Sequence, residues 1–75
     1  MSNVTPFTDR NGKTIKVGDT LSIPQNFDIQ GTYGQVQIQD NSYVVQEELT
    51  GNIFALDWLM RHRNNPFYQY PFVAN

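Results

Sequence analysis

The stretch from Val17 to Val45 decides the fold of this chain. It begins with V-G-D-T-L-S-I-P at 17–24 and ends with G-Q-V-Q-I-Q-D-N-S-Y-V-V at 34–45. In the second piece, Val36 and Ile38 alternate with three glutamines, a period of two that a β-strand produces and a helix does not. The pattern predicts a half-buried strand whose apolar face carries Val36 and Ile38 into the core.

A two-residue hairpin turn is predicted at Asp40-Asn41. Asp and Asn are among the few side chains that tolerate the positive φ of such a turn, and a second apolar segment, Ser42 to Val45, follows directly. The turn predicts the register of the hairpin, which pairs Gln39 with Ser42, Ile38 with Tyr43 and Val36 with Val45. Four apolar side chains then share one face of the hairpin.

Shorter extended segments are expected on both sides of this hairpin. Ile15 and Val17 alternate with polar residues, and Leu21 and Ile23 continue the inward face up to Pro24, where the strand should end because proline cannot donate a ladder hydrogen bond. Asn11-Gly12 and Gly18 are expected at tight turns, Gly18 with a positive φ. Gly34, which opens the central strand after a turn, is also expected to have a positive φ. Ile53 to Ala55 is a further short strand. Met1 to Phe7 offers little to bury and is predicted to be a flexible arm.

One short helix is predicted from Leu56 to Arg63, before the last strand. Leu56, Leu59 and Met60 give it a narrow apolar stripe, and its charge order, with Asp57 early and basic residues late, complements the helix dipole. The aromatic segment Phe67 to Val73 is predicted to be the closing edge strand. The expected fold class is mainly β: a small SH3-like five-stranded barrel that forms a single domain over residues 1–75.

Two motifs carry a family resemblance. The segment D-R-N-G-K-T-I-K-V-G-D-T-L at 9–21 resembles the opening of small phage and prophage proteins of the YopX type, and G-T-Y-G-Q-V at 31–36 is similar to the G-x-x-G-x-V end of a KOW-type motif. Both resemblances imply an SH3-like barrel, and the first implies a phage-encoded protein. The chain departs from the KOW pattern in having no basic residue from Val17 to Val45, so RNA binding is not the expected role.

Composition narrows the classes of function. The 75 residues include no cysteine, so neither a disulfide framework nor a cysteine-bound metal is expected. Seven acidic and five basic residues give a formal charge of −2, whereas affinity for a phosphate backbone grows with clustered Lys and Arg. The sequence shows no basic and apolar leader pattern and no run of apolar residues long enough to span a bilayer. We therefore expect a cytoplasmic protein, with no membrane contact and no cofactor.

Neither a catalytic nor a metal site is predicted. The sequence contains one histidine, a metal site would need further ligands, and the serines follow no nucleophile-elbow pattern. Glu47 and Glu48 are adjacent in an expected strand, so their side chains should point to opposite faces, and both are expected to be solvated.

Two groups of residues are candidates for binding. Aromatic side chains that give contact area with a polar handle could form a groove for an extended protein segment, as SH3-like domains do; they are Phe27, Tyr33, Trp58, Tyr68 and Tyr70. Their alternative role is to fill the core of a small chain. The basic cluster Arg61, His62 and Arg63 is a candidate contact for an anion or a nucleic acid, and its alternative role is to complement a helix C-terminus.

The function expected from these observations is a non-enzymatic protein-interaction module, monomeric or homodimeric, that binds and modulates a host or phage protein. One alternative is a nucleic-acid-binding barrel that uses Arg61, Arg63, Lys13 and Lys16. The other is a small structural or assembly protein that forms homo-oligomers through the glutamine-rich hairpin face.

Overall fold

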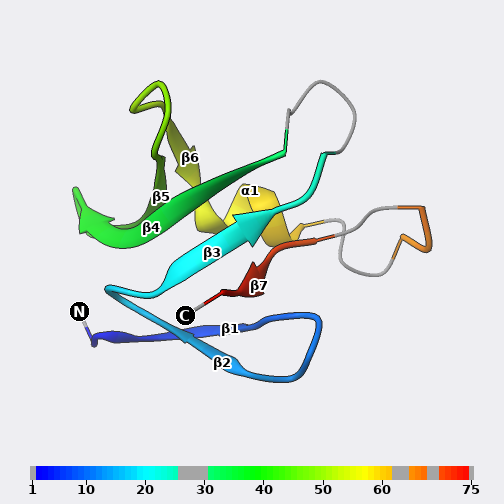
Figure 1. Cartoon of the computed structure of the whole chain (residues 1–75). Coiled ribbons are helices and arrows are strands. Elements are labelled where there is room, and N and C mark those ends of the chain that lie inside the picture. The colour runs from blue at the N-terminus through cyan, green and yellow to red at the C-terminus, as the bar shows by residue number, and fades with distance from the viewer. Residues whose placement is uncertain (1, 26–30, 62–64, 68–69, 75) are drawn as a thin grey trace.

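The fold is mainly β, with one antiparallel five-stranded sheet, a separate two-stranded sheet and one short helix (Figure 1). The computed structural model describes residues 2–25, 31–61, 65–67 and 70–74. The elements are β1 (Val4–Thr8), β2 (Thr14–Lys16), β3 (Thr20–Ile23), β4 (Thr32–Gln39), β5 (Ser42–Glu47), β6 (Ile53–Ala55), α1 (Leu56–Met60) and β7 (Phe72–Val73). The five-stranded sheet has the order β6-β5-β4-β3-β7, and β1 pairs with β2.

The β4–β5 hairpin has the predicted turn and register. Asp40 and Asn41 have φ of 52° and 62°, the left-handed values that a two-residue hairpin turn requires. The pairs Gln39–Ser42, Ile38–Tyr43 and Val36–Val45 all form as expected. Local turn chemistry and strand alternation therefore suffice to define the centre of the sheet.

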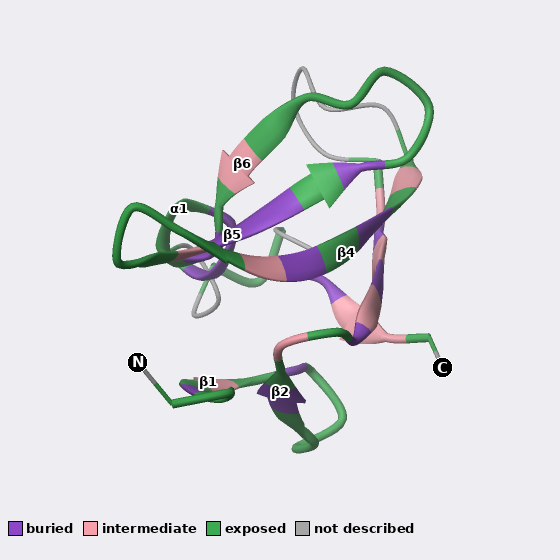
Figure 2. Cartoon of the chain, turned by 90° about the vertical axis from the view of Figure 1, so that its left-hand side faces the viewer, coloured by how far each residue is buried: buried purple, intermediate pink, exposed green. Residues whose placement is uncertain are grey.

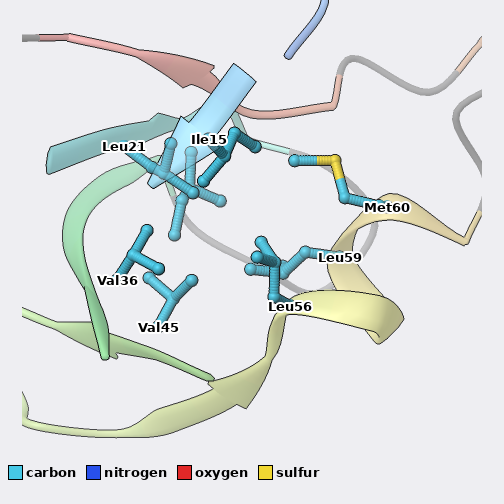
Figure 3. Packing of buried hydrophobic residues seen from close by; sticks show 8 residues of the cluster. Ile15, Leu21, Val36, Val45, Leu56, Leu59 and Met60 are labelled. Carbon is cyan, nitrogen blue, oxygen red and sulfur yellow. The ribbon is translucent and has the colours of Figure 1, made fainter. Parts of the chain in front are cut away.

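The core lies between one face of the five-stranded sheet, α1 and β2, which contributes Ile15. Its buried residues are Ile15, Leu21, Ile23, Val36, Val45, Leu56, Leu59 and Met60 (Figure 3). The three helical residues are those of the predicted stripe. The prediction for Ile38 is wrong, because its side chain is 38% exposed. Ile38 lies one cross-strand row beyond Val36, where the apolar core of the hairpin gives way to solvent.

Residues 4–7 are not a flexible arm, contrary to the sequence prediction. They belong to β1, which forms an antiparallel pair with β2. The Thr5 hydroxyl is buried and donates to the carbonyl of Ile15 at 2.8 Å, and the Val17 amide donates to the carbonyl of Asn3 at 2.7 Å. The alternation of apolar and polar residues did not predict this strand, because Thr5, its one fully buried side chain, is polar.

Two long-range contacts hold the β1–β2 hairpin against the five-stranded sheet. The φ of Gly18 is positive, as predicted, with a value of 95°. The Gly18 amide donates to the carbonyl of Val36 at 2.9 Å. At the hairpin turn, the buried carboxylate of Asp9 accepts hydrogen bonds from the amides of Asn11, Lys13 and Val73. These bonds outweigh burial, which raises the pKa of Asp9, so that the net effect lowers this pKa below its ordinary value.

The C-terminal segment closes the sheet over a shorter stretch than predicted. Of the described residues in this segment, only Phe72 and Val73 form a strand, β7, at the edge beside β3. Pro71 is buried, whereas Phe67 is 88% exposed.

The helix is also shorter than predicted, ending at Met60. Among the described residues, the strands form two separate hydrogen-bonded sheets, and no helix is long and apolar enough to cross a membrane.

Candidate binding site at one end of the five-stranded sheet

The strand register divides the five-stranded sheet into two faces. The inner face carries the row Val36, Val45 and Phe54 and packs against α1. The outer face carries the alternate residues, among them the glutamines of β4. Figure 2 shows this alternation as changes between buried and exposed colours along β4.

The predicted aromatic groove does not form as one surface. Tyr33, which pairs with Ser22, lies on the outer face. Trp58 lies on α1 and stacks on Phe54 of the inner face, with ring centroids 6.1 Å apart and an interplanar angle of 13°. Tyr70 packs against the core. Phe27 and Tyr68 lie outside the described residues.

An apolar hollow of about 390 Å³ opens where β3 ends, β4 begins and β5 ends. Tyr33 and Leu49 stand in its wall with exposed fractions of 52% and 85%. Its other lining residues are Ser22, Ile23, Pro24, Gly31, Thr32 and Glu48. We call this the Tyr33–Leu49 hollow. Leu49 is not among the binding residues predicted from the sequence.

Glu47 builds the turn that presents Leu49. Its carboxylate accepts hydrogen bonds from the Thr32 hydroxyl at 2.6 Å, from the amides of Leu49 and Thr50 at 2.7 and 2.8 Å, and from the Thr50 hydroxyl. The expectation that Glu47 is solvated is wrong, since its side chain is buried. The hydroxyl bonds of Thr32 and Thr50, followed by the two amides, lower the pKa of Glu47 to about 2.

The turn is also fixed by its backbone. Gly51 has φ of 76°, and its amide donates to the carbonyl of Glu47 at 2.9 Å. The amide of Glu48 donates to the carbonyl of Tyr33 at 2.9 Å, which joins the two walls of the hollow directly. Hydrogen bonds therefore link Tyr33 to Glu48 and shape the turn that carries Leu49. A Thr-Gly pair three residues after a glutamate was the sequence signal for this turn.

A second, polar hollow of about 330 Å³ lies next to the first on the outer face. Thr20, Gln35, Gln37, Gln46, Glu47, Glu48 and Gly51 line it. The amide nitrogen of Gln37 donates to the side-chain oxygens of Gln46 at 3.0 Å and of Gln35 at 3.4 Å. Glu48 lines both hollows, so the apolar and the amide-lined surfaces meet at its side chain.

The basic residues do not gather around either hollow. Arg61 forms an i,i+4 ion pair with Asp57 on α1, at 3.2 Å. The guanidinium carbon of Arg10 lies 4.4 Å from the centroid of the Phe72 ring. Lys13 and Lys16 are exposed on the β1–β2 hairpin. His62 and Arg63 lie outside the described residues, so the predicted basic cluster is described only at Arg61.

Within residues 2–25, 31–61, 65–67 and 70–74, no three His, Cys, Asp or Glu side chains are grouped so that they could hold a metal ion. Comparison of the chain with protein-family models, with curated proteins and with solved structures gives no match.

Proposed function

We propose that the protein is a non-enzymatic protein-interaction module that binds an extended segment of a partner protein in the Tyr33–Leu49 hollow. The observation that carries this proposal is the exposure of Tyr33 and Leu49 in the wall of one apolar hollow. The free energy falls when a partner covers a solvent-facing apolar surface and removes it from water. Tyrosine adds contact area at a low cost in side-chain entropy.

The architecture that supports this role is proposed to be an open SH3-like barrel. The β1–β2 hairpin packs beside the five-stranded sheet through the Gly18–Val36 and Asp9–Val73 hydrogen bonds. The short helix precedes the last strand, as in the expected layout. Such a frame leaves loops and strand ends free to vary for binding.

Selection from a library of random twelve-residue peptides displayed on a carrier tests the proposal. We expect enriched peptides that bind in the micromolar range. Tyr33→Ala and Leu49→Ala should each weaken binding at least tenfold, because each removes an apolar contact worth about 1.5 kcal/mol or more. Isothermal titration calorimetry gives the affinities.

The matched control is Phe67→Ala, which removes another exposed aromatic side chain that does not line the hollow. It should leave the affinity unchanged. Peptides that lose affinity equally in Phe67→Ala and Leu49→Ala would contradict the proposed site. Tight binding of a single-stranded oligonucleotide, with an affinity that falls steeply as salt rises, would favour the nucleic-acid alternative instead.

A further inference from the structure

We propose that the partner segment carries a lysine or arginine within two residues of the bulky apolar side chain that enters the Tyr33–Leu49 hollow. This inference rests on the proposed function and names the chemistry of its ligand. The side chain that selects the cation is Glu48, which lines both hollows.

Two adjacent carboxylates at this site have opposite environments. Glu47 is buried and accepts four hydrogen bonds, so its charge is already compensated. Glu48 is exposed, and among the described residues its carboxylate has neither a hydrogen bond nor an ion pair. A carboxylate beside an apolar hollow that a ligand covers would lose solvent on binding, and that loss favours a ligand that brings the opposite charge.

The described cations of the chain do not provide that charge. Arg61 is paired with Asp57, and Arg10 lies over the Phe72 ring. Lys13 and Lys16 belong to the β1–β2 hairpin, and neither lines a hollow that contains Glu48. Glu48 is therefore available to a charge from outside the described part of the chain.

The amide-lined hollow suits the backbone of an extended segment. Gln37 uses its amide nitrogen to reach Gln35 and Gln46, which leaves the amide nitrogens of Gln35 and Gln46 without a partner in the part of the chain that is described. These groups can donate to peptide carbonyls. An extended chain advances about 3.3 Å per residue. Because Glu48 stands in the wall shared by both hollows, the cation and the apolar side chain must be close neighbours in the ligand sequence.

The test repeats the peptide selection on three proteins: the unchanged chain, Glu48→Lys and Asp57→Asn. Asp57 lies on α1, on the inner side of the sheet, and its replacement removes an exposed charge that lines neither hollow. We expect peptides enriched in Lys or Arg beside a bulky apolar residue on the unchanged chain and on Asp57→Asn. On Glu48→Lys the basic residue should be replaced by Asp or Glu.

Affinities of one enriched peptide give the second measurement. Glu48→Gln should weaken binding about fivefold, as expected for one exposed charge pair. It should also remove most of the loss of affinity between 50 and 300 mM NaCl, because screening acts on the pair that the substitution deletes. Asp57→Asn, with the same net charge as Glu48→Gln, should show the affinity and the salt dependence of the unchanged chain.

The outcomes separate the two proposals. Peptides that lose affinity in Leu49→Ala but show no basic preference, or the same preference on Glu48→Lys, would overturn this inference and leave the proposed function standing. Selection that yields no peptide sensitive to Leu49→Ala would overturn both.

Discussion

At the scale of single residues, buried carboxylates accept hydrogen bonds from backbone amides that have no partner in a strand ladder, and Asp9 and Glu47, two of the three, do so most extensively. Asp9 accepts the amide of Val73, 64 positions away, and Glu47 accepts two amides and two hydroxyls around its turn. Each lies where the chain changes direction and the strand ladders leave amides unpaired. Asp9 thus positions the last strand through Val73, and Glu47 positions the turn that carries Leu49 of the candidate site.

The pKa values of both carboxylates predict acid sensitivity. The pKa of Glu47 is about 2 in the folded chain and ordinarily 4.5, and that of Asp9 lies below its ordinary 3.8. Because the folded-state values are lower, both groups contribute stability that is fully present above their ordinary pKa values and is lost as pH falls toward 2. Denaturant midpoints, followed by Trp58 fluorescence from pH 7 to pH 2, should fall mainly below pH 4.5.

The control is Glu47→Gln, which cannot titrate at this position. It should be less stable at pH 7 and should show a shallower fall between pH 4.5 and pH 2. An equally steep profile in both proteins would show that Glu47 is not responsible.

Gly34 is required for lack of space rather than for its φ. The sequence suggests a positive φ there, but only Gly12, Gly18 and Gly51 among the described glycines have one. A Cβ on Gly34 would lie 2.4 Å from Cγ1 of Val45 and 3.0 Å from the carbonyl oxygen of Gln46. Gly34→Ala should therefore lower the free energy of unfolding by about 1–3 kcal/mol through overpacking.

A double-mutant cycle checks the cause of this loss. Val45→Ala removes the atom that clashes, so Gly34→Ala should be less costly in a Val45→Ala background than alone, with a coupling of about 0.5 kcal/mol or more. Strict additivity of the two changes in urea unfolding would contradict the steric explanation.

At the scale of elements, the sequence predicted what local chemistry determines. The β4–β5 hairpin, the end of β3 at Pro24 and the apolar stripe of α1 follow from turn residues and periodicity within a few positions. The placement of β1 and β7 depends on partners such as Ile15 and Asp9, which no local pattern identifies. In the candidate site, Tyr33 was predicted from the sequence and Leu49 was not. The separation of Tyr33 from Trp58 depends on which face of the sheet α1 covers.

Val36 and Ile38, two positions apart on β4, should respond differently to replacement by a charged residue. Val36 is 1% exposed and Ile38 is 38% exposed, although both belong to the same predicted face. Val36→Asp should unfold the protein, since an unpaired buried charge costs more than the roughly 3–5 kcal/mol that a core of this size provides. Ile38→Asp should remain folded, with a loss of about 1 kcal/mol. Circular dichroism melting curves distinguish them, and equal unfolding of both would contradict the described end of the core.

The tail should be required for folding. Truncation after Pro66 removes four aromatic residues, buried Pro71, and the Val73 amide that Asp9 accepts. The loss of β7 also leaves the edge of β3 bare. We expect the truncated chain to be unfolded by far-ultraviolet circular dichroism. A stable protein that ends at Pro66 would mean that the tail is dispensable for the fold and available for binding.

At the scale of the whole molecule, the two sheets form one compact body. The radius of gyration of 11.3 Å is close to the value of about 11 Å expected for a folded chain of 75 residues. None of the residues that line the two hollows belongs to β1, β2 or α1. The exposed lysines and the stacked Trp58 thus lie outside both hollows, so the nucleic-acid alternative uses other residues than the proposed binding site. The homo-oligomer alternative shares the glutamines of the second hollow.

This separation allows one measurement to test whether the end of the sheet around Tyr33 and Leu49 is the binding site. A nitrogen-15-labelled sample is titrated with the most enriched selected peptide while the backbone amide resonances are followed by nuclear magnetic resonance. We predict that the largest saturable shifts fall on Tyr33, Glu48 and Leu49. Largest shifts on α1 around Trp58, or on the β1–β2 hairpin, would contradict the account.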